Sequence, residues 1–78
     1  MNISKTLKNK ISKKIGNAIS FYRIKQDMTQ EELAEKVGAD RTYIGALEQG
    51  AKCGSVCCLY LISKALNIDF KDMFDFDV

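Results

Sequence analysis

Apolar residues recur along this chain at helical rather than alternating spacing. Between residues 11 and 22 they fall at positions i, i+4, i+7, i+8 and i+11, which lines one face of a first helix. Leu7 and Ile3 extend this stripe towards the N-terminus, and Ser4 and Ser12 are both possible starts of the helix. Because the chain contains no proline, nothing in it has to interrupt a helix. The pattern predicts an all-α domain.

A second, short helix begins with a capping signal. The Thr29 hydroxyl can accept a hydrogen bond from the first turn, while Glu32, three residues later, reaches back to the Thr29 amide. Gly38 supplies the end of this helix, because glycine readily takes the left-handed conformation there. The residues expected on its inward face are Leu33, Ala34 and Val37.

Three further helical segments follow. Asp40 can cap a third helix over residues 41–49, and Ser55 can start a fourth over residues 56 to about 66. Asp69 can cap a short fifth turn. The inward residues expected are Ile44 and Leu47 in the third helix and Val56, Leu59, Ile62, Ala65 and Leu66 in the fourth, and the fifth turn carries Phe70, Met73 and Phe74.

Residues 28–38 read MTQEELAEKVG and residues 40–50 read DRTYIGALEQG, two short helices joined around a glycine as in a helix-turn-helix. From residue 15 to residue 74 the chain resembles the Cro/repressor type of this motif, also called XRE-like. The resemblance implies a compact, five-helix, lambda-repressor-like DNA-binding domain in which helices 2 and 3 form the motif. The family's small residue, turn glycine and two core positions match Ala34, Gly38, Ile44 and Leu47. From the residues alone, an ordinary helical hairpin with a chance glycine stays open.

The resemblance implies that the third helix lies in the major groove with its N-terminal residues at base edges. Arg41 is the strongest candidate for reading sequence, because a guanidinium can donate two hydrogen bonds to guanine O6 and N7. For Tyr43, contact with a phosphate or a thymine methyl and a packing role both stay open. The DNA-binding residues expected are Thr29, Gln30, Arg41, Thr42, Tyr43, Gly45, Ala46 and Lys52.

The family pattern also contains a glutamate that pairs with an arginine on the first helix. In this chain the matching residues are Glu48 and Arg23. We therefore expect an ion pair that fixes the motif to its scaffold.

The charge of the chain is divided by region. The formal net charge is +2, but residues 1–27 carry seven basic side chains against one acidic, a local balance of +6. Residues 28–52 and residues 53–78 each have a balance of −2. A basic first third can turn towards phosphate, although a solvated, lysine-rich helix has the same composition.

The composition excludes several classes of protein. With no histidine and three cysteines, the chain has neither the usual general base nor a good zinc site, and it lacks a phosphate-cradling glycine loop. We predict no enzymatic activity, no metal, no cofactor and no small-molecule ligand. The longest apolar run, Val56 to Ile62, is too short for a signal peptide or a membrane span. With the odd number of cysteines, this predicts a cytoplasmic protein.

Within the family, the chain is most similar to the controller proteins of restriction-modification systems, on its size and on the string DRTYI at residues 40–44. This resemblance implies a sequence-specific transcription regulator that binds a palindromic operator as a dimer and controls a restriction-modification operon. Short phage repressors and antitoxins share these features. An antitoxin-like or regulator-binding module, which uses the same fold to bind a protein, is the alternative function.

A homodimer is expected because a single DNA-binding domain of this size contacts few base pairs. The two half-sites of the operator would then lie about 34 Å apart. Residues 1–10 are expected to be a basic extension or the start of the first helix, and residues 11–78 a single domain ending in a dimerisation region. For Phe70 and Phe74, packing inside the monomer stays open. The interface residues expected are Tyr60, Phe70, Phe74, Phe76 and Val78.

Overall fold

The computed structural model describes residues 3–78, and within that range it contains helices and no strand. Residues 1 and 2, which belong to the segment expected as a basic extension, lie outside the described residues. The α-helices are α1 (Lys5–Lys25), α2 (Gln30–Val37), α3 (Arg41–Glu48) and α4 (Val56–Ala65), followed by a 3-10 helix, η1 (Phe70–Phe74).

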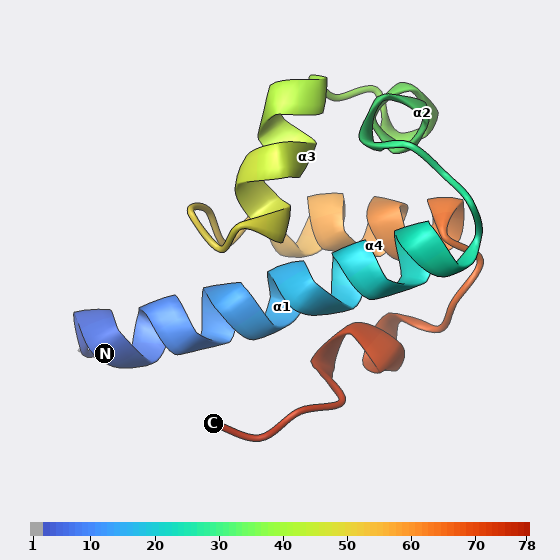
Figure 1. The fold of residues 1–78 in the computed structure, drawn as a ribbon. Helices are drawn as coiled ribbons and strands as arrows, with labels where there is room; N and C mark the ends of the chain where they lie inside the picture. The colour runs from blue at the N-terminus through green and yellow to red at the C-terminus, as the bar shows by residue number, and fades with distance from the viewer. Residues whose placement is uncertain (1–2) are drawn as a thin grey trace.

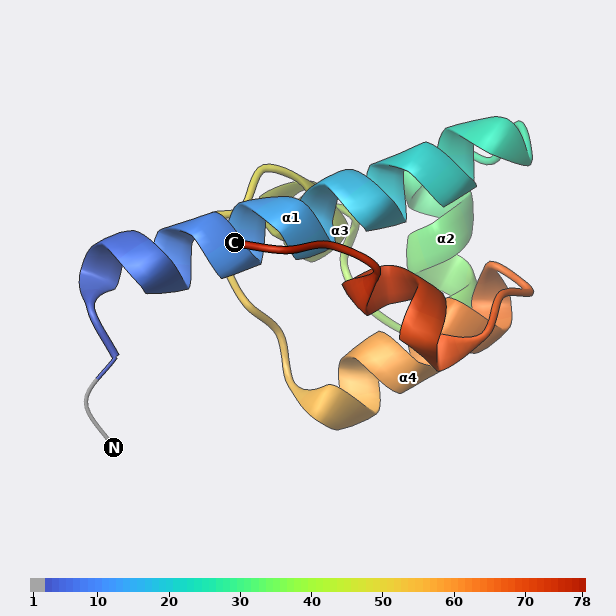
Figure 2. The same ribbon diagram turned by 90° about the horizontal axis from the view of Figure 1, so that it is seen from below.

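Helix α1 is the long central element of the fold. In Figure 1 it crosses the molecule, with α3 rising on one side and η1 lying on the other. Seen from below, the segment after η1 runs back along α1, and α4 lies apart from it (Figure 2). Helix α1 packs against both α3 and η1, while α2 packs against α3 and α4. The reading motif and the C-terminal segment therefore share one scaffold helix.

The predicted count of five helices is not confirmed: the described residues contain four α-helices, and the expected short fifth turn is η1, a 3-10 helix of five residues. The amide of Asp72 donates to the carbonyl of Asp69 at 3.0 Å, three residues back, which is 3-10 geometry. The Asp72 carboxylate accepts from the Asp69 amide at 3.2 Å. Met73 is fully buried and anchors the segment in the core.

The core lies where α1, α2, α3 and α4 meet. Its fully buried side chains come from every helix, and the inward positions expected in α2 and α3 are correct for Leu33, Ala34, Ile44 and Leu47. Gln26, just after α1, donates through its side chain to the carbonyl of Leu66 after α4. The largest fully buried side chains are Ile19, Leu33, Ile44, Leu47, Ile62, Leu66 and Met73.

Three apolar residues expected on inward faces are exposed. Val56 is 71% exposed because it is the first residue of α4 and no element lies opposite it. Leu7 and Ile3 are also exposed, since the first turn of α1 and the residues before it extend past the core. At these helix starts the apolar residues keep the helical spacing, but no neighbouring element buries them.

The starts of α1, α2 and α4 follow the expected caps. Ser4 caps α1, Ser55 caps α4, and Thr29 forms the predicted reciprocal capping box with Glu32. The backbone and hydroxyl hydrogen bonds from Thr29 lower the pKa of Glu32, because they favour its charged form. Asp40 stands at the N-cap of α3, but its side chain makes no capping hydrogen bond.

None of the helices in residues 3–78 combines the length and the apolar character that crossing a membrane requires.

Candidate nucleic-acid interface

Helices α2 and α3 form the expected motif around a tight turn. Gly38 ends α2 with φ of +73°, in the left-handed region where glycine has no steric penalty. The amide of Ala39 donates to the carbonyl of Ala34 at 2.9 Å, which closes the turn. Because Ala34 is buried and small, the two helices can cross closely. This crossing leaves the opposite face of α3 directed to solvent.

The solvent face of α3 contains the expected reading residues. Arg41 and Thr42 are exposed at its N-terminal end, while Gly45 and Ala46 are half-buried on the same face. Gln49, immediately after the helix, is exposed on this face one turn further along. The face combines a long cation at one end with small residues in the middle, so another surface can approach its backbone closely.

Helix α3 is attached to α1 by a buried ion pair, as expected. Arg23 Nε donates to Glu48 Oε2 at 2.6 Å and Nη2 donates to Glu48 Oε1 at 3.0 Å, so the contact is bidentate. Arg23 also donates to the carbonyl of Met28 at 2.7 Å, ahead of α2. The hydrogen bond with Glu48 raises the pKa of Arg23, outweighing its partial burial. A single guanidinium therefore connects α1, the start of α2 and the end of α3.

Gln30 joins the same network from α2. Its Nε2 donates to Glu48 Oε1 at 3.1 Å, and its amide lies beneath Gly45 of α3. Thr29 and Gln30 also line a shallow hollow of about 570 Å³ together with Arg41. The start of α2 and the start of α3 thus face the same space. Helix N-terminal amides at such a place favour an anion.

Tyr43 has a packing role in the structure. Its ring is half-buried, and its hydroxyl lies against Gly54 in the loop before α4. Partial burial, followed by the interaction with the Cys58 thiol, raises the pKa of Tyr43. Lys52 is exposed and its Nζ lies 5.9 Å from the centre of the Tyr43 ring. Tyr43 therefore fixes the loop against α3, and a DNA contact by Tyr43 or Lys52 stays a prediction.

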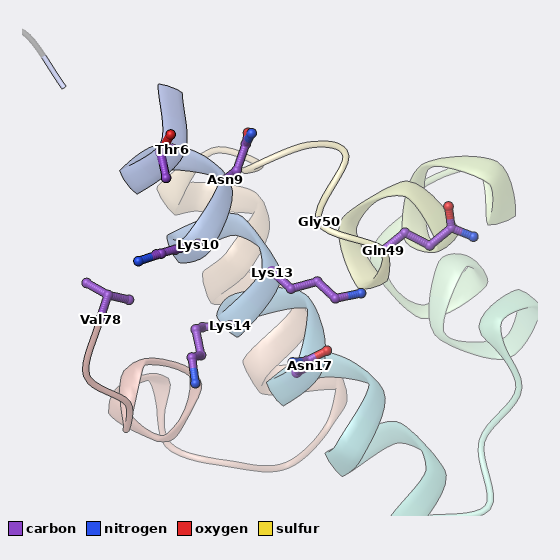
Figure 3. Close-up of a pocket in the computed structure, with 9 residues that line it drawn as sticks. All are labelled: Thr6, Asn9, Lys10, Lys13, Lys14, Asn17, Gln49, Gly50 and Val78. Atoms are coloured by element: carbon purple, nitrogen blue, oxygen red, sulfur yellow. The ribbon is translucent and has the colours of Figure 1, made fainter. Parts of the chain in front are cut away.

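The residues expected at a dimer interface are only partly brought together. Tyr60, Phe70, Phe74 and Phe76 form a continuous aromatic row, with ring centres 5.9, 5.0 and 6.5 Å apart in that order. Phe70 and Phe76 are half-buried against the core, whereas Tyr60 and Phe74 are exposed. Val78 lies instead beside the first half of α1 (Figure 3). We call these four rings the aromatic row. It begins on α4, continues along η1 and ends just after it.

The thiols form no disulfide. Cys53, Cys57 and Cys58 are free, and no group of three possible metal ligands occurs in residues 3–78. Cys53 Sγ lies 2.7 Å from the hydroxyl of Ser12, which is buried in the middle of α1. Ser12 is thus a contact with the loop and not the start of a helix.

The sequence profile of the helix-turn-helix family, HTH_3, matches residues 19–73, which include the motif, the ion pair and most of the core. The chain belongs to this family. It is 45% identical over 59 residues to an HTH-type transcriptional regulator of Archaeoglobus fulgidus, covering 76% of this chain and 84% of that protein. The family consists of DNA-binding transcription regulators and not of enzymes.

Two solved structures of helix-turn-helix regulators are similar to this protein. The restriction-modification controller protein C.AhdI from Aeromonas hydrophila matches with a TM-score of 0.78 and 30% identity, covering 81% of this chain and 96% of that one. SinR, the master regulator for biofilm formation, was solved in complex with DNA. It matches with a TM-score of 0.73 and 29% identity, covering 78% of this chain and 98% of the SinR chain. The expected similarity to restriction-modification controller proteins is confirmed.

Sequence reasoning missed one packing contact beneath this surface and one exposed residue on it. Gly16, in the middle of α1, lies against the carbonyl oxygens of Leu47 and Glu48, and an isolated glycine in a helical pattern was the available signal. Gln49 was not among the expected contacts, although it follows Arg41 by eight residues and so shares its face.

Proposed function

We propose that this protein is a sequence-specific transcription regulator that binds a palindromic operator as a homodimer. The observation that carries the proposal is the solvent face of α3, which begins at the exposed Arg41 and is anchored at its far end through Glu48 to Arg23 on α1. In the proposed complex this face lies in the major groove. The small Gly45 and Ala46 let the helix backbone approach the bases, so DNA shape contributes to specificity beside Arg41.

The phosphate backbone is contacted at the start of α2 in this proposal. Thr29 and Gln30 open the hollow that also contains Arg41, and the first amides of α2 point out of the helix there. Lys52 is proposed as a further phosphate contact because it is exposed at the other end of α3. Control of a restriction-modification operon is the proposed biological role, on the likeness to C.AhdI.

Selection of bound sequences from random duplexes tests the proposal. We expect an inverted repeat with a guanine at the position that Arg41 reads. Arg41→Ala is expected to weaken binding by about 1–3 kcal/mol for each half-site of that repeat and to abolish the preference for guanine at the position that Arg41 reads. A selection that yields no common sequence, together with affinity insensitive to salt, would instead indicate a protein-binding module.

The aromatic row is the proposed dimer interface. Tyr60 is exposed at its edge, so Tyr60→Asp places a charge in the interface without opening the core. We expect wild-type protein to sediment as a dimer at tens of micromolar and Tyr60→Asp to sediment as a monomer, because a buried unpaired carboxylate opposes association. The matched control is Val56→Asp, which alters an exposed position outside the row. Equal sedimentation of Tyr60→Asp and wild type would contradict this interface.

A further inference from the structure

A polar groove runs along the first half of α1 and ends at α3. It has a volume of about 830 Å³, and Figure 3 shows α1 side chains on one wall, Gln49 and Gly50 after α3 on another, and Val78 at the edge. The α1 residues are spaced at i, i+3, i+4, i+7, i+8 and i+11, so they form one stripe of the helix. They are Thr6, Asn9, Lys10, Lys13, Lys14 and Asn17.

The chemistry of the groove suits a polyanion. Each polar side chain on its walls is an ammonium, an amide or a hydroxyl, which are the groups that donate to phosphate oxygens. No acidic residue precedes Asp27 in the sequence, so α1 contains none of its own. Within the described part of the chain the one side-chain ion pair is Arg23 with Glu48. The groove lysines are therefore free to neutralise an external charge.

The groove is continuous with the solvent face of α3. Arg41, Gly45 and Gln49 follow one another at i, i+4 and i+8, so the face that starts at Arg41 ends on the groove wall. Gly50 lies directly against the backbone of α1, because an ideal Cβ at Gly50 would lie 2.9 Å from Lys13 Cα, and the ion pair of Arg23 with Glu48 attaches α3 to α1. A nucleic acid bound to α3 would meet the groove in a fixed position.

We propose that this groove is a second phosphate-binding surface, which follows the DNA backbone next to the segment read by α3. The stripe from Thr6 to Asn17 is about 16 Å long at 1.5 Å per residue, enough to pass several phosphates of one strand. Lys10, Lys13 and Lys14 neutralise phosphates, while Asn9 and Gln49 donate to their oxygens. The inference rests on the proposed function and adds a part of the protein outside the helix-turn-helix motif.

Salt titration of DNA binding tests the groove with the full chain and two duplexes, one containing its selected sequence and one of random sequence. The test variant combines Lys10→Gln, Lys13→Gln and Lys14→Gln, and the control combines the same change at Lys8, Lys25 and Lys36, which are exposed and lie outside the groove and the aromatic row. Each phosphate contact adds about 0.9 to the slope of log affinity against log salt. We expect the groove variant to lose about 2.7 from that slope for each bound protomer, or about 5.4 for the proposed dimer, so from 50 to 200 mM salt the wild-type dimer loses on the order of 10³-fold more affinity than the variant.

The outcomes separate this inference from the proposed function. Retained base preference with a reduced slope in the groove variant, and a wild-type slope in the control, supports the groove. Equal slopes in the two triple variants overturn it, even if Arg41→Ala abolishes base preference and the regulator function stands. A reduced slope in a protein that selects no sequence supports the groove as a polyanion site and overturns the regulator. Circular dichroism checks that each variant is folded, since glutamine and lysine have similar helix propensity.

Discussion

Gly16→Ala is expected to lower the free energy of unfolding by about 3 kcal/mol, because α1 and the end of α3 touch through their backbones at this point. An ideal Cβ at Gly16 would lie 2.6 Å from the carbonyl oxygen of Glu48 and closer still to that of Leu47. Neither oxygen can rotate away as a flexible side chain would, so the helices must separate. The gain of about 1 kcal/mol in helix propensity from glycine to alanine is too small to offset this.

Gly45→Ala is the matched control for that experiment. Gly45 is also inside a helix, but an added Cβ would meet only the side chain of Gln30, at 3.6 Å. We expect its free energy of unfolding to stay the same or to rise by up to about 1 kcal/mol. Urea denaturation of both variants measures the difference. Equal stabilities of Gly16→Ala and wild type would mean that α1 and α3 are further apart than the structure places them.

Glu48→Ala is expected to cost about 3 kcal/mol, since it leaves the half-buried guanidinium of Arg23 without its carboxylate. It also removes the acceptor of Gln30 on α2. For a domain of this size the total stability is about 4–12 kcal/mol, so the loss lowers the melting temperature by about 15 °C. Arg23→Met is expected to have a similar effect, because the carboxylate would then lose its two strongest donors.

A double-mutant cycle isolates the ion pair. The double variant Arg23→Met/Glu48→Met should lose less stability than the summed losses of Arg23→Met alone and Glu48→Met alone. The reason is that the double variant leaves no unpaired charge between α1 and α3. We expect a coupling energy of about 2 kcal/mol from thermal or urea unfolding. Strictly additive losses would show that Arg23 and Glu48 act through packing alone.

Much of the motif could be predicted because its signals are local. The capping box of Thr29 and Glu32 lies within one turn, and Gly38 marks a turn at the residue where it occurs. The pairing of Arg23 with Glu48 spans 25 residues, and only the family resemblance indicated it. Apolar spacing predicted the short fifth turn but not its 3-10 geometry, because spacing alone does not distinguish an α-helix from a short 3-10 helix anchored by Met73.

The sequence by itself determined the four α-helices of this protein, the starts of α2, α3 and α4 and the turn between α2 and α3, because each depends on residues at most a few positions apart. Only the tertiary structure decided which apolar positions are covered. Val56 and Leu7 follow the helical pattern yet remain exposed, since burial requires another element opposite. It also decided the packing of Tyr43 on the α3–α4 loop and the contact of Gly16 with α3. Such contacts join residues far apart in the chain, and their distances follow from how whole helices cross.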